Sequence, residues 1–396
     1  MIPARRNAFN ESFTQEKYDA LHRHLEERAG VDIHFRLSET PCFLPASLVR
    51  RLEDAARTMV TGLLSNAEYM SAAEAVVPDE FRVAHDESRP TFLAVDLGLI
   101  QTDRGVEARL VELQAFPSLY GFQMALAEAH IAEYGLHGLE IFLDGLTKDQ
   151  YLGVCRDAMV GRHDPAEVVL MEIDPLHQKT LPDFKITEQL WGVRAVDART
   201  VTREGRKLFY DRDGKRTQIK RVYNRVIPDE LTRTGATFAF DYRDDLDVEW
   251  TGGPDWFFKI SKFSIPWITH PWVPETHYLD RLDRLPADRE EWLLKPLFSF
   301  AGGGIIFSPS DADIAAIPAA ERRHFILQRR IHFTPEFETP YGPTQAEIRI
   351  MFVRDGNEYR AVIPLLRMGR GKMMGVDHNK GLLWVGASAG LIDPAV

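Results

Sequence analysis

The stretch Trp292–Phe307 reads Trp-Leu-Leu-Lys-Pro-Leu-Phe-Ser-Phe-Ala-Gly-Gly-Gly-Ile-Ile-Phe, and the fold is organised around it. Its two ends, Trp292–Leu294 and Ile305–Phe307, are apolar runs of strand length around a loop of small residues, which predicts a hairpin with a flexible tip. Lys295 closes the first strand. Backbone N–H groups of such a tip can approach phosphate oxygens, with the lysine as a charge beside them. An ordinary hairpin with glycines at positive φ explains this segment alone equally well.

Several common site types are absent from the sequence. No Gly-Lys-Ser/Thr follows the glycines, and the loop does not open a helix, so neither a Walker loop nor a dinucleotide fingerprint is present. The 13 histidines include no His-Glu-x-x-His pair, which argues against a zinc site. Ser118 lies in Pro-Ser-Leu and not in a nucleophile elbow, so a helix cap is its expected role.

Composition indicates an ordinary globular protein of two or three domains, with 396 residues and a net charge of −11. The absence of a basic run argues against nucleic acid or an anionic membrane surface as a partner. Cys42 and Cys155 are far apart and are expected to be buried thiols in a reducing compartment. Without a signal peptide or a spanning run, the cytoplasm is the expected location. The sequence leaves open whether two copies form a homodimer.

The N-terminal third changes from helix to strand at Pro90. Residues 15–28 and the stretch opened by Pro45 and Ser47 have helical spacing. Two predicted strands follow. The first, Thr91–Ile100, contains Asp96, and the second, Val106–Leu113, contains Glu112 and is followed directly by Gln114. A helix is expected from about Phe122 to Tyr134.

Glu112 and Gln114 are two residues apart on a strand, so both point to one face, and Asp96 can join them if the hairpin register allows. Such oxygen donors suit Mg²⁺, which uses one or two carboxylates and leaves its other positions to water and phosphate. A strand-end glutamate in a salt bridge with Arg109 or another arginine is the structural alternative.

Alternating strands and helices between Tyr151 and Leu231 predict an open α/β domain. Its strands are expected at Glu167–Ile173, Val193–Val196, Leu208–Tyr210 and Gln218–Tyr223, with a helix over Thr187–Trp191. Arg225, at the end of the last strand, is a candidate for a substrate anion or for a structural role.

The C-terminal part continues with further predicted elements: a short helix over Phe257–Phe263 that offers Lys259 and Lys262, a helix over Asp311–Arg323, and strands at Phe325–Ile331, Glu347–Val353 and Glu358–Leu366. The tail from Met368 is rich in glycine, and its Asp377–Gly381 segment suits either a ligand loop or a plain turn.

Taken together, these motifs resemble the nucleotide site of the ATP-grasp family. Lys295 resembles the phosphate-binding lysine and Phe298–Gly304 the flexible glycine loop. Arg349 matches the arginine of an acid-x-Arg strand that faces the triphosphate. The resemblance implies nucleotide contacts from Lys262, Lys295, Ser299, Ala301, Gly302, Gly303, Gly304, Gln328, Arg329, Arg330 and Ile331, with the last four on a strand whose backbone meets adenine.

The order of the motifs resembles the circularly permuted branch of this family, which includes eukaryotic-type glutathione synthetase and, more loosely, glutathionylspermidine synthase. The metal-ligand pattern, Asp96 with Glu112-x-Gln114, precedes the nucleotide motifs, and the arginine strand with Arg367 precedes an Ala/Gly-rich lid. Gln114 stands where the family has asparagine, and Gly369 where it has a lysine.

The resemblance implies an α/β (α+β) ATP-grasp fold with a Rossmann-like pre-ATP-grasp domain. Its expected parts are an N-terminal helical region (1–88), the permuted part with the metal ligands (89–150), the substrate domain (151–250), and the nucleotide-binding subdomains with the lid (251–396).

It also implies an ATP- and Mg²⁺-dependent carboxylate–amine ligase. Such an enzyme forms an amide through an acyl phosphate on a small amino acid, peptide or polyamine. Lys295, Arg349 and Arg367 are then the catalytic residues, and the acid and the amine are the expected partners. A non-catalytic ATP-binding module and a protein without any nucleotide site are the alternatives.

Overall fold

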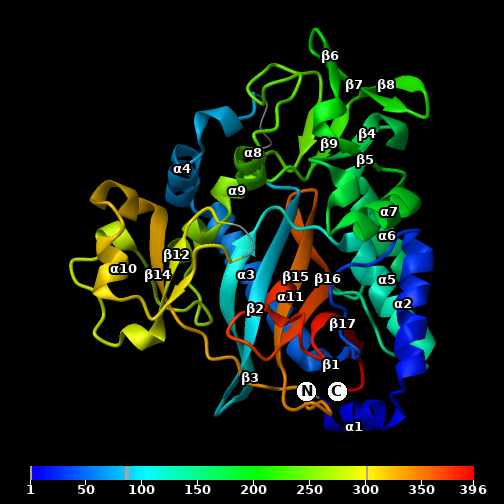
Figure 1. Ribbon diagram of the computed structural model, residues 1–396, viewed down its shortest axis with the longest axis vertical. Coiled ribbons are helices and arrows are strands. Elements are labelled where there is room, and N and C mark those ends of the chain that lie inside the picture. Colours follow the sequence, from blue (N-terminus) through cyan, green and yellow to red (C-terminus); the bar gives the residue numbers. More distant parts are fainter. Residues whose placement is uncertain (1, 85–88, 300–301) are drawn as a thin grey trace.

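A six-stranded sheet, called the central sheet below, forms the middle of the molecule and joins segments from both ends of the chain (Figure 1). The computed structural model describes residues 2–84, 89–299 and 302–396. In spatial order the strands are β1 (Cys42–Pro45), β17 (Gly386–Asp393), β16 (Glu358–Gly369), β15 (Gln345–Asp355), β2 (Phe92–Thr102) and β3 (Gly105–Gln114). β1 runs parallel to β17, and the other neighbours are antiparallel.

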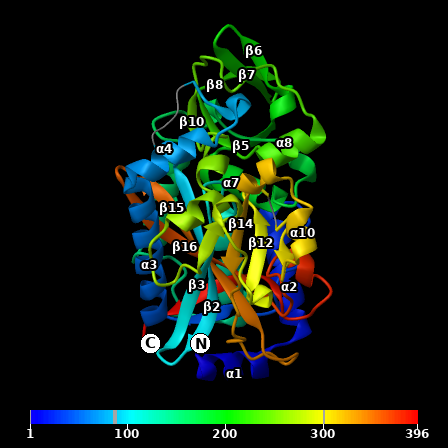
Figure 2. The ribbon, with the colours of Figure 1, turned by 90° about the vertical axis from the view of Figure 1, so that its left-hand side faces the viewer.

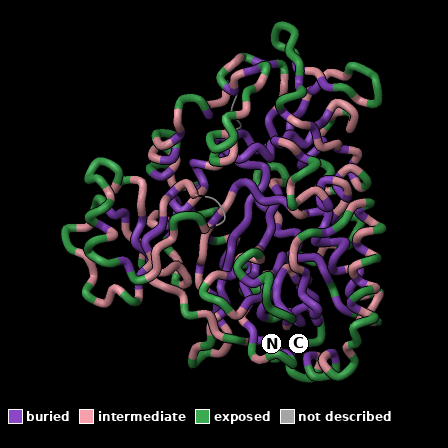
Figure 3. The backbone as a smooth tube through the Cα atoms, in the orientation of Figure 1, coloured by how far each residue is buried: buried purple, intermediate pink, exposed green. Residues whose placement is uncertain are grey.

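Helices cover both faces of the central sheet. Alternate side chains of each strand point to opposite faces, so Val95 and Leu97 share a buried cluster with α3 (Ala46–Ser65). The other face packs on α5 (Tyr120–Tyr134) and α2 (Gln15–Ala29), at the right of Figure 1. The helices expected at 15–28, after Pro45 and near 122–134 are confirmed. Figure 3 shows that the central strands are mostly buried and that exposed residues concentrate in peripheral loops.

A four-stranded parallel sheet, called the parallel sheet below, confirms the predicted α/β pattern of the middle segment. Its order is β10 (Glu249–Thr251), β9 (Arg221–Asn224), β4 (Val168–Glu172) and β5 (Arg194–Asp197), with α7 (Leu181–Trp191) between β4 and β5 in the chain. Parallel strands need such a crossover helix.

The single strand predicted over Gln218–Tyr223 is wrong, because two strands of different sheets divide it. β8 (Lys215–Ile219) belongs to a small antiparallel sheet with β6 (Thr202–Glu204) and β7 (Lys207–Arg212), whereas β9 joins the parallel sheet. The chain changes partners at Lys220, whose backbone N–H donates to the carbonyl of Glu167.

The quoted stretch forms the predicted hairpin, in a separate antiparallel sheet called the hairpin sheet (Figure 2). Its order is β11 (Thr276–Tyr278), β14 (Phe325–Arg329), β12 (Trp292–Pro296) and β13 (Ile306–Phe307). Leu294 is opposite Ile306, as the apolar runs predicted. Trp292 and Leu294 pack with Leu327 in a small core of their own.

Two predicted helices are broken by local backbone chemistry. The helix expected over Asp311–Arg323 is divided into α10 (Asp311–Ala315) and the 3₁₀ helix η8 (Ala319–His324), because Pro318 lies between them and cannot continue an α-helix. The helix expected over Phe257–Phe263 ends as α9 (Trp256–Lys259), and η5 (Lys262–Trp267) follows an extended Ile260. Lys259 and Lys262 therefore belong to different elements.

The remaining helices connect these sheets. They are α1 (Pro3–Ser12), α4 (Ala67–Ala75), η1 (Asp79–Phe81), α6 (Lys148–Met159), η2 (Pro165–Glu167), η3 (Pro175–His177), η4 (Ala198–Thr200), α8 (Pro228–Thr234), η6 (Leu279–Arg281), η7 (Arg289–Glu291) and α11 (Val376–Asn379). In the described ranges, no helix has both the length and the apolar character that crossing a bilayer requires. Cys42 and Cys155 are buried free thiols, as expected. The predicted domain bounds stay a prediction.

Candidate active site

A cavity of about 470 Å³ lies between the hairpin sheet, the central sheet and the segment 370–381, which we call the glycine-rich segment. Predicted site residues from both ends of the chain line it together: Glu112, Lys295, Gly302, Arg330, Ile331, Arg349 and Arg367. The acids of the first third and the cations of the last third of the chain therefore meet in one place.

Lys295 lies on the cavity side of the hairpin sheet. Leu293 and Lys295 alternate with the core residues Trp292 and Leu294 on β12, so they share the opposite face and line the cavity. The side chain is buried, at 4% exposure. Burial lowers the pKa of Lys295 to about 8, although the negative charge of Glu112 acts in the opposite direction.

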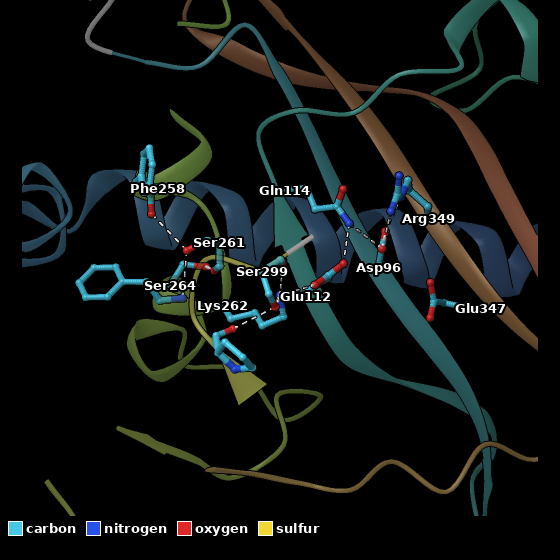
Figure 4. A network of polar contacts seen from close by, with 12 residues as sticks. Asp96, Glu112, Gln114, Phe258, Ser261, Lys262, Ser264, Ser299, Glu347 and Arg349 are labelled. Carbon is cyan, nitrogen blue, oxygen red and sulfur yellow. Dashed lines mark hydrogen bonds and ion pairs between the residues drawn. The ribbon is translucent and has the colours of Figure 1, made fainter. Parts of the chain in front are cut away.

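Asp96 is the anionic centre of a network on the central sheet (Figure 4). It lies opposite Arg349 in the register of β2 and β15, and Arg349 donates to its two carboxylate oxygens, Nε at 2.6 Å and Nη2 at 2.7 Å. Arg367 Nη2 donates to Asp96 at 2.9 Å and also to Glu347. Asp96 is fully buried, and a bidentate pair with additional hydrogen bonds is the arrangement that makes a buried charge tolerable.

Glu112 is, of the two predicted acidic metal ligands, the one that lines the cavity, which Glu347 and Asp377 also line. Gln114 Nε2 donates to Glu112 at 2.6 Å and to Asp96 at 3.2 Å, so all three predicted metal ligands are adjacent. Lys262 Nζ lies 3.7 Å from Glu112 and donates to the carbonyl of Ser299 at 2.8 Å (Figure 4). Lys262 thereby connects β3 to the start of the hairpin tip. Arg109 pairs with Glu107 and not with Glu112, whose ion pair among the described residues is with Lys262 rather than with an arginine.

The charge states of this network follow from burial and partners. Burial alone would raise the pKa of Glu112, but the nearby cations Lys262 and Lys295, together with the two arginines, outweigh it and lower that pKa. Burial raises the pKa of Glu347 despite its contact with Arg367. Burial acts against the charge of Arg349, yet Asp96 raises its pKa above the ordinary value.

Glu112 fits Mg²⁺ better than Asp96 does. Glu112 is ionised and lines the cavity, whereas both oxygens of Asp96 are occupied by arginines. Within the described residues no group of three or more His, Cys, Asp or Glu side chains is arranged to hold a metal ion. Mg²⁺ between protein and phosphates needs only one or two carboxylates, so Glu112 can serve as its protein ligand beside a nucleotide.

The strand predicted to meet adenine is β14. Gln328 is fully buried, pairs with Leu293, and has no partner for either atom of its side-chain amide among the described residues. Such unpaired buried polar atoms are uncommon in native proteins and are satisfied by a ligand or water. Arg329 points away, to Asp288 at 2.9 Å and over Trp292. The contact of the backbone with adenine stays a prediction.

The glycines of the hairpin tip make close contacts that a side chain would prevent. Gly302 has φ +76°, and a Cβ there would lie 2.5 Å from Met373 Cε of the glycine-rich segment. Gly304 has φ +72°, and a Cβ would lie 2.8 Å from Pro296. Gly303 is exposed, and Ala301 lies outside the described residues. The two glycine-containing segments therefore meet at Gly302.

Sequence reasoning missed three features of the glycine-rich segment. Asn379 organises it, because its amide donates to the carbonyls of Met373 and Gly375 and accepts from the N–H of Arg370. Lys179 Nζ pairs with Asp377 at 2.6 Å, and both line the cavity.

Lys372 is the third feature. Its side chain and that of Arg330 lie over the ring of Phe307 at the cavity wall. The glycine spacing indicated a loop here, but these partners come from distant elements and leave no local signal.

A second group of buried polar side chains lies at the carboxyl ends of β4 and β9 in the parallel sheet. Burial raises the pKa of Glu172 to about 8. Arg225 is buried and donates to the carbonyl of Phe116, while its Nε and the Nδ2 of Asn224 have no partner among the described residues. This edge of an open parallel sheet is where ligands commonly bind, and whether Arg225 binds an anion or has a structural role stays a prediction.

Comparisons with known proteins agree with this architecture. No protein-family model and no curated protein matches the sequence. Among solved structures, the chain is similar to a glutathione synthetase-like effector from Globodera pallida, described in its apo form. The match covers 95% of this chain and 96% of the other, with a TM-score of 0.58 and 11% sequence identity. The chain therefore has a mixed α/β fold similar to that of this glutathione synthetase-like effector.

Proposed function

We propose that this protein is an ATP- and Mg²⁺-dependent carboxylate–amine ligase built on a circularly permuted ATP-grasp fold. One observation supports the proposal most strongly. Glu112 on β3 and Lys295 on β12, which are far apart in the sequence, line one cavity together with Arg349 and Arg367. Such convergence of the Glu112 carboxylate with several cations suits a metal–nucleotide complex.

The residues present suit phosphoryl transfer, which needs positioning and charge neutralisation more than a covalent nucleophile. Lys295 would neutralise nucleotide phosphate charge from the hairpin sheet. Arg349 and Arg367 would stabilise negative charge that develops on the carboxylate being phosphorylated. Their pairing with Asp96 holds both guanidinium groups in place.

Mg²⁺, when bound, would neutralise phosphate charge. Glu112 would hold it, with Gln114 beside it. The hairpin tip and the glycine-rich segment, which touch at Gly302 and Met373, would exclude water that would otherwise hydrolyse an acyl phosphate.

Phosphate release in reactions with ATP and Mg²⁺ tests the proposal. Pools of amino acids, small peptides and polyamines are supplied together and then with one class omitted at a time. We expect release only when an acid and an amine are both present. Lys295→Ala and Glu112→Ala should each lower the rate by about a hundredfold, the size of single electrostatic contributions. The exposed Lys207→Ala is the control. Full turnover by both site variants would refute the proposal.

A non-catalytic ATP-binding module is the second candidate. It is favoured by Asp96, whose carboxylate is already occupied by Arg349, Arg367 and Gln114. In that case ATP would bind equally well with and without Mg²⁺, and no pool would release phosphate.

A further inference from the structure

The polarity of the side chains changes across the central sheet, along one row of paired residues. The register places Glu112, Asp96, Arg349, Leu365 and Ala389 side by side, on β3, β2, β15, β16 and β17. The first three are charged and belong to the proposed phosphate end of the cavity. The last two are apolar, so this row changes from charged to apolar side chains between β15 and β16.

Further apolar side chains surround this second end of the same cavity. Leu365 is joined in the cavity wall by Phe35, Leu119 and Phe122, and the rings of Phe35 and Phe122 lie 5.2 Å apart at 71°. Met374 and Val376 of the glycine-rich segment add two apolar side chains to the lining, next to the ion pair of Lys179 and Asp377. We call these six residues the apolar chamber.

Leu119 of the chamber is held in an unfavourable backbone conformation. Its φ is +79°, in the left-handed region that a leucine seldom adopts. The buried carboxylate of Asp183 fixes it, because it accepts hydrogen bonds from the N–H groups of Leu119 and Phe122, each at 2.9 Å. The fold therefore maintains strain that holds an apolar side chain at this point of the cavity wall.

Arg367 borders the chamber. It lies two residues from Leu365 on β16, so both point to the cavity face. Its Nη2 is bonded to Asp96 and Glu347, but its buried Nε has no partner among the described residues. A buried guanidinium donor without a partner fits a carboxylate ligand.

We infer that the acid substrate of the proposed ligase carries a branched or phenyl-sized apolar group, with its carboxylate at Arg367 and its apolar group in the apolar chamber. The inference rests on the proposed function and adds the substrate class to it. A small polar acid would leave water in the apolar chamber, because it has no apolar group that could contact these side chains and displace the water.

Calorimetric titration of two carboxylates tests the inference. Propanoate and 3-phenylpropanoate share the acid group and differ by one phenyl ring. They are titrated into the protein with Mg²⁺ and a non-hydrolysable ATP analogue. We expect 3-phenylpropanoate to bind at least tenfold more tightly, since burial of an aromatic ring commonly contributes that much.

Two variants of the chamber should reduce this ratio to below about threefold. Leu119→Asn makes the wall polar with a residue that tolerates positive φ, and Val376→Ser does so on the glycine-rich segment, in case the first variant fails to fold. Leu176→Asn, at a leucine that is 66% exposed and outside the cavity lining, is the matched control and should keep the wild-type ratio.

Equal binding of the two acids to the wild-type protein would overturn the inference, as would binding of neither acid. An unchanged ratio in both chamber variants would also overturn it. The ATP analogue is titrated first, and the acids are titrated again without nucleotide. Failure of the analogue to bind counts against the proposed function alone, whereas the ratio of the two acids still reports on the chamber.

Discussion

At the scale of single residues, Lys295 shows how burial adjusts a charge for binding. Its ammonium group is almost completely buried beside Glu112 and Lys262, and its pKa is lowered to about 8. The group is therefore charged at neutral pH but close to losing its proton. A bound phosphate would favour the charged form and draw a proton onto it.

Nucleotide affinity should therefore fall as the pH rises through 8. Above that pH the free protein holds a neutral Lys295, and binding an anion requires proton uptake, so the affinity for an ATP analogue should decrease by up to about tenfold per pH unit. Calorimetry between pH 7 and 9.5 measures this dependence. Lys295→Arg stays charged across the range and should give a flat profile. An equal decline in that variant would assign the titration to another group.

The raised pKa of Glu172 predicts how the stability of the fold depends on pH. Burial raises its pKa from 4.5 to about 8, so its protonated form is favoured in the folded protein. The stabilisation is complete below the unfolded value, near pH 4.5, and is lost as the pH rises through 8. Between pH 5 and 8 the free energy of unfolding of Glu172→Gln should rise relative to wild type, by at most about 1.4 kcal/mol per pH unit.

Urea unfolding at each pH measures this difference. Glu80→Gln, at an exposed glutamate, is the control and should run parallel to wild type. Parallel curves for Glu172→Gln would mean that Glu172 is already ionised in the folded protein.

At the scale of elements, the glycine-rich segment depends on one side chain. Asn379 makes three hydrogen bonds to backbone groups of residues 370, 373 and 375. Asn379→Ala would remove the side-chain partner of the Arg370 N–H and the Met373 carbonyl, whereas the Gly375 carbonyl still accepts from the N–H of His378. Each lost hydrogen bond contributes about 0.5–1.5 kcal/mol. Amide hydrogen exchange over residues 370–380 should become faster, with little change elsewhere.

The exposed Lys380→Ala is the matched control, since it alters the same helix end without removing these hydrogen bonds. Unchanged exchange in Asn379→Ala would show that packing of Met373 against Gly302, and not Asn379, holds the segment.

Sequence patterns predicted the elements well where an element depends only on residues that are neighbours in the chain. The apolar runs around the glycine tip gave the hairpin, and the alternation around Asp96 gave β2. Prediction failed where the chain changes sheets at Lys220 and where Pro318 divides a helix-like stretch. The apolar chamber left no sequence signal, because its residues come from four separate segments.

At the scale of the whole molecule, one buried ion pair joins the first and last thirds of the chain. Asp96 and Arg349 are 253 residues apart in sequence and opposite each other in the sheet. The sequence identified both residues, but only the register of β2 against β15 shows that they bond to each other. Asp96, which was predicted as a metal ligand, thus accepts hydrogen bonds from Arg349 and Arg367 in this structure.

Asp96→Asn should therefore destabilise the fold as a whole. It leaves the buried Arg349 without its carboxylate and Arg367 with Glu347 alone, and breaking such a buried pair typically costs about 3–5 kcal/mol. Urea unfolding without Mg²⁺ measures it, and the exposed Asp54→Asn on α3 is the control. In a double-mutant cycle, Arg349→Met should recover part of the loss. A loss below about 1 kcal/mol would show that the pair contributes little to stability.

The central claim is that Glu112 and Lys295 hold one metal–nucleotide complex between them. The measurement that tests it most directly is calorimetric titration of a non-hydrolysable ATP analogue, with and without Mg²⁺, into wild type, Lys295→Ala and Glu112→Gln. We predict at least tenfold weaker binding by Lys295→Ala under both conditions. Glu112→Gln should lose only the gain in affinity that Mg²⁺ provides. Wild-type affinity in both variants, with the gain from Mg²⁺ intact, would contradict the claim.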